Sequence, residues 1–528
     1  MATTLTATGI IQQRWGEPWI VGVDAEDFWP RLQQCQTQLQ KHRYPDVLLV
    51  ESEPIQFLAA FLATCQQPGR VWLANPQWGL QEWQQVAEQC VPDLIVGTVP
   101  SAVTNVWGDR AISQLTRNDF TPIEATSDYP TPRTGMALPY PYPNSNAMND
   151  RPPTQILIPT GGSSGNLRFA VHTWETLSGS VQGFQQHFQS PVVNAYCVLP
   201  LFHVSGLMQA MRCLLSGGQL ILQPFQTLLQ EGAIASPSDN LFLSLVPTQL
   251  QRLLNSGRDF IPWLRQFTAI LLGGAPAWPS LLNTARDLQL PLSPTYGMTE
   301  TASQVATLLP AEFLAGNTGS GRALPHASIT IRDNTGQSLA PNQTGHIAIE
   351  AKSLAQGYNQ TPLTSPFQTG DLGHLDESGY LYVQGRQKAL IITGGEKVLP
   401  EEVEAAILTT GMVQDVIVIG IPDEDWGEVV VAVVVPAATR PVASLTQNAR
   451  TDYLGHWNPD RLIQYLKSQL SPYKLPKHWL VRTSLPRNPQ DKLNRTALGV
   501  WVEQQLQQRS PIAPATQSVP GQVDSAVE

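Results

Sequence analysis

Short apolar runs alternate with longer amphipathic segments along the first hundred residues. The runs Asp46–Glu51, Val71–Ala74 and Asp93–Val99 are short and apolar enough for buried strands. Between them, Ile55–Cys65 and Leu80–Cys90 have the length and apolar content of helices. Strands that alternate with helices in this way are typical of a parallel α/β sheet.

The apolar runs continue through the middle of the chain and then change in character. Further strands are predicted at Gln155–Ile158, Tyr196–Pro200, Gln219–Leu222, Leu241–Val246 and Ala269–Leu272. After about Ser328 the pattern becomes strand-rich, which predicts a β-barrel-like part. Its strands are predicted at Ser328–Arg332, Gly345–Glu350 and Gly379–Val383.

The C-terminal part of the chain mixes both kinds of pattern. Helices are predicted at Glu401–Leu408 and Asp460–Leu470, and strands at Val416–Ile421, Val429–Val435 and Trp479–Arg482. This order predicts a separate small α+β domain. Two segments lack apolar periodicity: residues 121–153, with eight prolines, are predicted to form a surface loop, and residues 510–528 a disordered tail.

The composition narrows the classes of function. The net charge is −10, which gives the chain no bulk attraction for nucleic acid or an anionic membrane surface. The five cysteines contain no CxxC pair, so neither a disulfide framework nor a cysteine metal site is predicted. The longest apolar run, Val429–Val435, is too short for a membrane helix, and the N-terminus does not resemble a signal peptide. We therefore expect a cytoplasmic protein with no transmembrane segment.

One segment has the composition of a phosphate-binding loop. Directly after the predicted strand QILIP comes Thr160–Arg168, with the sequence TGGSSGNLR. Glycines let backbone N–H groups approach a phosphate, hydroxyls add donors, and the terminal cation balances charge. The segment is not a Walker A motif, and taken alone it is also typical of a flexible turn.

This segment resembles the phosphate loop of the acyl-adenylate-forming superfamily, which includes acyl-CoA ligases, adenylation domains of peptide synthetases and firefly luciferase. It departs from the common pattern at its end, where Leu167, Arg168 and Phe169 replace Pro, Lys and Gly. Arg keeps the charge but presents a planar fork. The resemblance implies that ATP or AMP is bound by Thr160, Gly161, Gly162, Ser163, Ser164, Gly165 and Arg168.

Two further segments of the large part resemble motifs of the same superfamily. Residues 296–301, YGMTET, resemble its YGxTE motif. The resemblance implies that Tyr296 and Gly297 adjoin the nucleotide, that Thr299 contacts phosphate oxygens and that Glu300 holds Mg²⁺. A carboxylate suits this hard cation, which bridges phosphates. Gly273, Gly274 and Ala275 follow the strand AILL and resemble the loop beside adenine.

The remaining motifs lie towards the C-terminus, in the order found in the superfamily. The TGD of residues 369–371 implies that Asp371 binds the ribose hydroxyls, and the GRQK of residues 385–388 implies that Arg386 also meets the ribose and that Lys388 is the hinge between domains. Gly394 and Gly395 resemble residues of the pantetheine channel, and Pro400 is predicted to begin a helix. Lys492 matches the catalytic lysine, although Asp491 stands where Gly is usual.

Together the motifs span residues 155–495 and imply an enzyme with ATP and CoA as co-substrates and Mg²⁺ as its metal. The implied fold is a large N-terminal domain of α/β sheets with a β-barrel-like part, over residues 1–385, and a small mobile α+β domain over residues 386–509. The lysine of the small domain would neutralise charge while a carboxylate attacks the α-phosphate of ATP.

The segment that resembles the acyl pocket suggests the acid. Residues 199–206, LPLFHVSG, place His203 beside the expected substrate, and Arg212 follows within an apolar run on a predicted helix. An arginine there forms a structural ion pair, lies at an exposed end, or binds a second carboxylate of the substrate. The combination resembles the o-succinylbenzoate–CoA ligases of menaquinone and phylloquinone biosynthesis.

Three alternatives remain at this stage. A broader aryl- or medium-chain acyl-CoA ligase would not need Arg212. A non-catalytic nucleotide-binding paralogue would not need to retain Glu300, Asp371, Arg386 and Lys492. A peptide-synthetase module would carry an LGGxS carrier domain, and the LGG at residues 272–274 continues as Ala-Pro instead.

Overall fold

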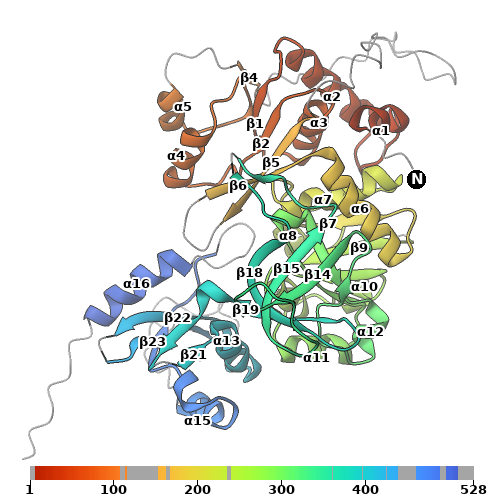
Figure 1. The fold of residues 1–528 in the computed structure, drawn as a ribbon. Coiled ribbons are helices and arrows are strands. Elements are labelled where there is room, and N and C mark those ends of the chain that lie inside the picture. The colour runs from red at the N-terminus through yellow and green to blue at the C-terminus, as the bar shows by residue number, and fades with distance from the viewer. Residues whose placement is uncertain are drawn as a thin grey trace, which may run out of the picture.

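The structure is a computed structural model that describes residues 6–107, 113–115, 153–161, 167–234, 239–359, 361–394, 396–423, 425–437, 460–487 and 495–508. Two mainly parallel sheets with their helices and one antiparallel sheet form the large part of the molecule, and a further sheet forms the C-terminal part (Figure 1). The predicted surface loop, apart from Pro153, and the predicted disordered tail lie outside the described residues.

The first sheet has eight strands in the order β17-β16-β6-β5-β2-β1-β3-β4. Its strands are β1 (Asp46–Val50), β2 (Arg70–Leu73), β3 (Leu94–Gly97), β4 (Ser113–Leu115), β5 (Gln155–Gly161), β6 (Leu167–His172), β16 (Gly357–Tyr358) and β17 (Thr361–Pro362). Strands β1 to β5 are parallel to one another. Strand β6 is antiparallel to β5, β16 is antiparallel to β6, and β17 is antiparallel to β16.

The second sheet has seven strands in the order β13-β12-β11-β10-β9-β7-β8. They are β7 (Asn194–Cys197), β8 (Leu220–Leu222), β9 (Leu241–Leu245), β10 (Ala269–Leu272), β11 (Leu292–Met298), β12 (Ser303–Thr307) and β13 (Arg322–Ala323). A short 3-10 helix, η3 (Thr299–Thr301), connects β11 to the antiparallel β12.

Helices fill the space between and around these two sheets. The core between the sheets contains side chains from α1 (Ala7–Arg14), α2 (Ala25–Leu39), α3 (Pro54–Thr64), α6 (Trp174–Phe188) and α7 (Val204–Ser216). The other face of the first sheet is covered by α4 (Leu80–Gln89) and α5 (Ser101–Trp107). The other face of the second sheet is covered by α8 (Phe225–Glu231), α9 (Pro247–Leu254), α10 (Ile261–Leu264), α11 (Pro279–Asp287) and α12 (Pro310–Leu314).

The strand-rich region forms a four-stranded antiparallel sheet in the order β14-β15-β18-β19. Its strands are β14 (Ala327–Arg332), β15 (Gly345–Ala351), β18 (Phe367–Leu375) and β19 (Leu381–Arg386). Ile329, Ile347 and Ile349 of this sheet share one core with Tyr296 and Val305 of β11 and β12. Packing against that antiparallel extension gives the barrel-like arrangement expected from the sequence.

The C-terminal part is an α+β unit around a mixed sheet. The strands β20 (Ile391–Thr393), β21 (Glu396–Val398), β22 (Val413–Asp423), β23 (Gly427–Pro436) and β24 (His478–Val481) form the sheet, with α13 (Pro400–Thr409), α15 (Asp460–Gln469) and α16 (Arg495–Gln508) around it. Apolar side chains of β22 and β23 alternate between two cores, one with α13 and α15 and one with α16. Helix α13 also packs against α11 of the large part.

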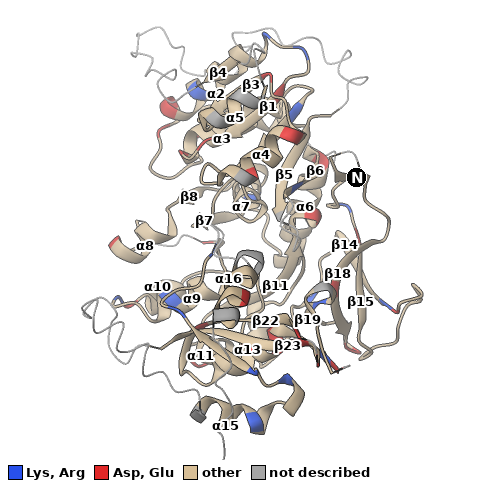
Figure 2. Ribbon diagram, turned by 90° about the vertical axis from the view of Figure 1, so that its left-hand side faces the viewer, with Lys and Arg blue, Asp and Glu red and all other residues tan. Residues whose placement is uncertain are grey.

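The fold class predicted from the sequence is confirmed. Each strand and helix predicted from an apolar run is present, with ends shifted by up to three residues, and Pro400 lies in the first turn of α13 as expected. All five cysteines are buried as free thiols. Acidic and basic positions are dispersed over the described chain (Figure 2). Within the described residues, no helix is long and apolar enough to cross a membrane.

Candidate active site

Glu300 lies at the base of the predicted phosphate loop. It is buried in η3, and its Oε1 accepts hydrogen bonds from the hydroxyls of Tyr358 at 2.7 Å and Thr160 at 3.3 Å. Thr160 is near the end of β5, and Gly161 is its last residue. The structure therefore brings two motifs that are 140 residues apart in the sequence into direct contact.

Arg168 and Tyr358 form one wall of this site. Arg168 pairs with Thr160 across the β5–β6 ladder, and its guanidinium lies 4.1 Å from the centroid of the Tyr358 ring. Burial and the neighbouring Glu300 carboxylate raise the pKa of Tyr358, so its hydroxyl stays protonated as a donor. The loop residues Gly162, Ser163, Ser164 and Gly165 lie outside the described residues.

His172 fixes the backbone of the turn that carries Thr299 and Glu300. Its Nε2 lies 2.8 Å from the carbonyl oxygen of Thr299, and its Nδ1 lies 3.0 Å from the hydroxyl of Thr176. Because a carbonyl only accepts, Nε2 carries the proton and donates. Burial lowers the pKa of His172 to about 4, so the ring is neutral near pH 7.

The turn after η3 is held in an unusual backbone conformation. Ala302 and Ser303 have φ angles of 49° and 84°, a region that residues other than glycine seldom adopt. The hydroxyl of Ser180 on α6 donates to the carbonyl of Ala302 at 2.7 Å. A Cβ on Gly297 would lie 2.1 Å from the carbonyl oxygen of Ser303, so only glycine permits this close pairing of β11 and β12.

Asp371 contacts Arg386, so the two motifs that are expected to bind the ribose lie side by side. It lies on β18 directly opposite Arg386 of β19, whose Nε donates to Oδ1 at 3.1 Å. The hydroxyl of Tyr296 donates to the other carboxylate oxygen at 2.7 Å. Burial and the Asp371 charge raise the pKa of Tyr296 well above its usual value. The Asp371 side chain is buried while the Arg386 side chain is half exposed, which leaves the cation accessible to a ligand.

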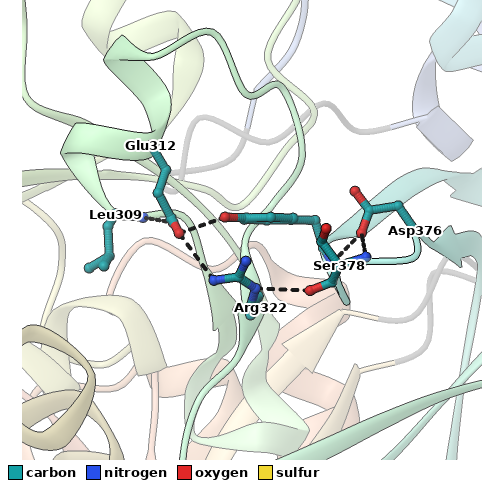
Figure 3. A network of polar contacts seen from close by, with 6 residues as sticks. Leu309, Glu312, Arg322, Asp376 and Ser378 are labelled. Atoms are coloured by element: carbon teal, nitrogen blue, oxygen red, sulfur yellow. Dashed lines mark hydrogen bonds and ion pairs between the residues drawn. The ribbon is translucent and has the colours of Figure 1, made fainter.

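A polar network holds the β18–β19 hairpin, which carries Asp371 and Arg386, against the rest of the large part (Figure 3). Glu312 of α12 accepts from the Tyr380 hydroxyl at 2.6 Å and from Arg322 at 3.3 Å. Arg322 in turn donates to the carbonyl of Ser378 and stacks on the Tyr380 ring. Asp376 closes the hairpin turn by accepting from the backbone N–H groups of Ser378 and Tyr380.

The predicted adenine loop follows β10 as expected. Gly273, Gly274 and Ala275 lie in the turn between β10 and α11, and Gly273 packs against Thr295 of the neighbouring β11. This turn and the start of the YGMTET motif therefore lie at the same end of the second sheet. The placement agrees with a common nucleotide site, while the contacts of these residues with a nucleotide remain a prediction.

The acyl-pocket residues lie on α7. His203 is its buried N-cap residue, and its ring packs edge-on against Phe202 with 4.4 Å between the centroids. Arg212 is 2% exposed, and its Nη2 donates to Gln304 Oε1 at 2.8 Å and to Ser303 Oγ at 3.2 Å. Its guanidinium lies over the Phe184 ring at 4.3 Å. These contacts tie Arg212 to β12 directly after the η3 turn.

Arg212 is a buried cation whose partners in the described chain are neutral. Within the described residues, no carboxylate oxygen lies within 4.0 Å of it, and its Nε makes no hydrogen bond. Burial lowers its pKa to about 10, so it remains charged near pH 7. The ion pair considered from the sequence is thus not seen among the described residues.

The C-terminal part places one candidate channel residue beside an exposed aromatic ring. The N–H of Gly394 donates to the carbonyl of Trp426 at 2.8 Å, and a Cβ on Gly394 would lie 2.9 Å from that ring. Trp426 is 46% exposed, and the Lys477 ammonium lies 3.2 Å from its ring centroid. Lys388 lies in η4 (Gln387–Ala389) between β19 and β20. Gly395 and Lys492 lie outside the described residues.

Comparison with known families decides the relationship. The sequence model of the AMP-binding enzyme matches residues 35–359, more than half of the chain, and that of the AMP-binding enzyme C-terminal domain matches residues 402–492. The chain belongs to the AMP-binding enzyme family. The superfamily resemblance inferred from the motifs is therefore confirmed, and the two matches fall on the large and small parts of this AMP-binding enzyme.

Curated relatives of this AMP-binding enzyme act on different acids by name. The 2-succinylbenzoate–CoA ligase of Geobacillus kaustophilus (strain HTA426) is 34% identical over 64% of this chain and 66% of its own length, and that of Oceanobacillus iheyensis is 34% identical over 57% and 60%. The matches thus span less than two thirds of these two relatives. The indoleacetate–CoA ligase of Aromatoleum aromaticum is 33% identical over 65% and 66%.

Solved structures agree in fold. The o-succinylbenzoate CoA synthetase of Bacillus subtilis, in complex with its acyl-adenylate intermediate, has a TM-score of 0.72 at 23% identity and covers 93% of this chain and 97% of its own. The ATP-bound MatB of Rhodopseudomonas palustris has a TM-score of 0.73 at 23% identity, with coverages of 94% and 99%. Both similarities support the two-part architecture described above.

Several residues of the candidate site lie outside the motifs visible in the sequence. Tyr358 lies in a two-residue strand outside every motif, and Trp426 and Lys477 are far apart in the sequence. His172 had a visible signal, because it is a polar residue that ends the apolar strand RFAVH. Gln304 also lies in an apolar strand, three residues after the YGMTET motif.

Proposed function

We propose that this AMP-binding enzyme is an acid–thiol ligase that joins 2-succinylbenzoate to CoA through an acyl adenylate, in menaquinone or phylloquinone biosynthesis. The observation that carries the choice of acid is Arg212, a buried cation with no anionic partner among the described residues. The names of the first two relatives point to the same acid. The indoleacetate–CoA ligase is almost equally similar, so identity alone does not select the substrate.

In the first half-reaction, an oxygen of the succinyl carboxylate attacks the α-phosphorus of ATP. The P–O bond to the β-phosphate breaks, and pyrophosphate leaves with that electron pair. Asp371 and Arg386 would hold the ribose, and Thr160, Thr299 and Arg168 the phosphates. Lys492 would neutralise the charge that builds up in the transition state, and one positioned donor of this kind contributes about 3–4 kcal/mol.

Glu300 fits the role of a Mg²⁺ ligand. It is a buried carboxylate beside the phosphate loop, and only its Oε1 accepts a hydrogen bond among the described residues. Mg²⁺ is commonly held by one or two protein carboxylates together with substrate phosphates. When bound, the ion would neutralise phosphate charge. Tyr358 and Thr160 would orient the carboxylate for it.

In the second half-reaction, the CoA sulfur, having lost its proton to solvent, attacks the acyl carbon, and the bond to AMP breaks. The thiol needs a path to that carbon. Residues 386–509 would turn as a small domain about Lys388 relative to residues 1–385, bringing Gly394 and Gly395 to the pantetheine. Exposed Trp426, with Lys477 over its ring, offers a stacking surface and a cation for the nucleotide of CoA.

The second carboxylate explains why Arg212 is buried. When the succinyl carboxylate joins AMP, the aromatic carboxylate of 2-succinylbenzoate remains free and would pair with the guanidinium. A hydrogen bond to a charged group contributes about 1.5–3 kcal/mol. Removal of one partner of a buried pair is costly because the other charge is left uncompensated. We place the reaction in the cytoplasm, since five free thiols fit a reducing compartment.

The test is ATP- and CoA-dependent turnover of three acids, followed by pyrophosphate release and thioester formation. 2-Succinylbenzoate should be turned over far faster than benzoate, which lacks the succinyl arm, or octanoate, which lacks the second anion. Comparable rates on all three would establish a broader acyl-CoA ligase. Absence of pyrophosphate release with every acid would establish a non-catalytic nucleotide-binding paralogue.

A further inference from the structure

Three further buried polar side chains lie on or next to the elements that hold Arg212. Gln209 lies one turn before Arg212 on α7. Gln304 of β12 accepts a hydrogen bond from Arg212, and His326 lies between β13 and β14. Each is at most 7% exposed. We call Gln209, Arg212, Gln304 and His326 the polar subsite.

Both His326 and Arg212 contact helix α6. A Cβ on Gly183 would lie 1.8 Å from Nδ1 of His326, so the imidazole packs directly on the helix backbone. The next residue, Phe184, lies under the Arg212 guanidinium. Helices α6 and α7 pack side by side (Figure 1), and the Arg212 charge acts on the His326 imidazole.

The polar subsite holds donors that the described chain does not use. Arg212 Nε and Gln304 Nε2 are buried donors that make no hydrogen bond with any described residue. The two ring nitrogens of His326, of which one donates and the other accepts in the neutral ring, and the acceptor Gln209 Oε1 are also buried and make no hydrogen bond with a described residue. Buried polar atoms are nearly always paired in folded proteins. A guanidinium N–H, an amide NH₂ and an imidazole N–H together match a carboxylate, which accepts through two oxygens.

The charges around His326 favour an anion as well. Arg212 and Lys352 are the charged groups that act on it, and both are cations. Burial, with a smaller effect of these two cations, lowers the pKa of His326 to about 4, so His326 is a neutral donor near pH 7. A neutral donor strengthens a carboxylate site without adding a further buried charge.

We propose that His326 is a specificity-determining residue that binds, with Arg212 and Gln304, the carboxylate of the substrate that is not adenylated. This inference rests on the proposed function and deepens it. It implies that the enzyme recognises a dicarboxylic acid through a charged and a neutral donor together. The neutral donor would add directional selectivity to the charge of Arg212.

The experiment compares kcat/KM for two acids in the full-length enzyme. 2-Succinylbenzoate carries the aromatic carboxylate, and 4-oxo-4-phenylbutanoate has the same ring and arm without it. His326→Leu should lower kcat/KM for 2-succinylbenzoate, mainly through KM, by up to about 10- to 150-fold, because one hydrogen bond to a charged group is lost. Its kcat/KM for 4-oxo-4-phenylbutanoate should not fall.

Two further variants separate recognition from folding. His326→Gln retains a donor and should keep most of the selectivity for the dicarboxylic acid, and the exposed His478→Leu should match the wild type with both acids. Because both acids are compared within one variant, a partly unfolded preparation lowers both values equally. Equal loss on the two acids, or no loss on either, would overturn the inference alone. A wild type that does not turn over 2-succinylbenzoate would overturn the proposed function and the inference with it.

Discussion

The hydroxyl of Tyr358 donates a 2.7 Å hydrogen bond to the carboxylate of Glu300. Tyr358 pairs with β6 of the first sheet, and Glu300 follows β11 of the second, so this bond joins the two sheets at the candidate phosphate site. The Tyr358 ring also supports Arg168. One residue outside every motif therefore positions both the expected metal ligand and the expected phosphate-binding cation.

Tyr358→Phe should weaken Mg²⁺ activation while preserving the ring under Arg168. Loss of a hydrogen bond to a charged group corresponds to about 1.5–3 kcal/mol, or roughly 10- to 150-fold, as an upper range. The Mg²⁺ concentration for half-maximal pyrophosphate release should rise by at least several-fold. Tyr465→Phe, on the exposed surface of α15, is the control. An unchanged Mg²⁺ requirement would show that this bond does not orient Glu300.

His172 should make stability depend on pH between about 4 and 6.5. The pKa of His172 is lowered to about 4 in the folded protein, against about 6.5 in the unfolded chain. The unfolded chain binds more protons than the folded protein in this pH window. The contribution of neutral His172 to the free energy of unfolding is therefore complete above pH 6.5 and is lost as the pH falls towards 4. The contribution is at most roughly 3 kcal/mol.

Urea unfolding at several pH values measures this effect. His172→Gln retains a donor for the Thr299 carbonyl and should reduce the slope of the unfolding free energy against pH. The reduction should correspond to at most one proton fewer taken up on unfolding. His478→Gln, at an exposed histidine, should leave the slope as it is. Equal slopes in wild type and His172→Gln would contradict a buried neutral His172.

Apolar patterning predicted most of the central strands because they are buried on both faces. Strands β1, β9 and β10, for example, are short apolar runs between helices. The missed elements have different origins. Strands β16 and β17 have two residues each; β16 pairs with β6, and β17 pairs with β16. Strand β12 owes its position to the strained turn at Ala302 and Ser303. Such pairings depend on tertiary contacts that periodicity does not encode.

The candidate site was predictable where a motif is continuous in the sequence. Residues 296–301 and 369–371 singled out Glu300 and Asp371, and the structure places each of them in contact with a residue of another motif, while their roles stay predictions. His326 was not predictable, because no motif marks it and because it packs on Gly183, next to the residue that lies under Arg212, only once the chain is folded. That no carboxylate of the described chain lies near Arg212 could likewise not be predicted from the sequence, because it depends on the tertiary structure.

Trp426→Ala should impair only the half-reaction that uses CoA. Loss of the exposed ring with the Lys477 ammonium over it removes a stacking surface beside Gly394. A cation–π or stacking contact contributes about 0.5–2 kcal/mol, so KM for CoA should rise by roughly 2- to 30-fold. Pyrophosphate release without CoA should remain at the wild-type rate, and Trp426→Phe should retain most of the affinity. An unchanged KM for CoA would remove Trp426 from the proposed channel.

Lys492→Ala should cut adenylate formation by at least about 10², the effect of losing one positioned donor in the transition state. Thioester formation from supplied acyl adenylate should be spared, because that step breaks the bond to AMP without attack on phosphorus. Single-turnover assays of each half-reaction measure both rates, with the exposed Lys467→Ala as control. Equal loss in both half-reactions would indicate a general defect in folding or binding instead.

The central claim is that Arg212 binds a second carboxylate of the substrate. Its most direct test is the kcat/KM of Arg212→Ala for 2-succinylbenzoate. Loss of a charge-assisted bond of about 1.5–3 kcal/mol predicts a fall of about 10- to 150-fold. Arg212→Lys keeps the charge without the fork and should recover only part of it, whereas Arg252→Ala, at an exposed position of α9, should behave as wild type. Unchanged kinetics of Arg212→Ala on 2-succinylbenzoate would contradict the account.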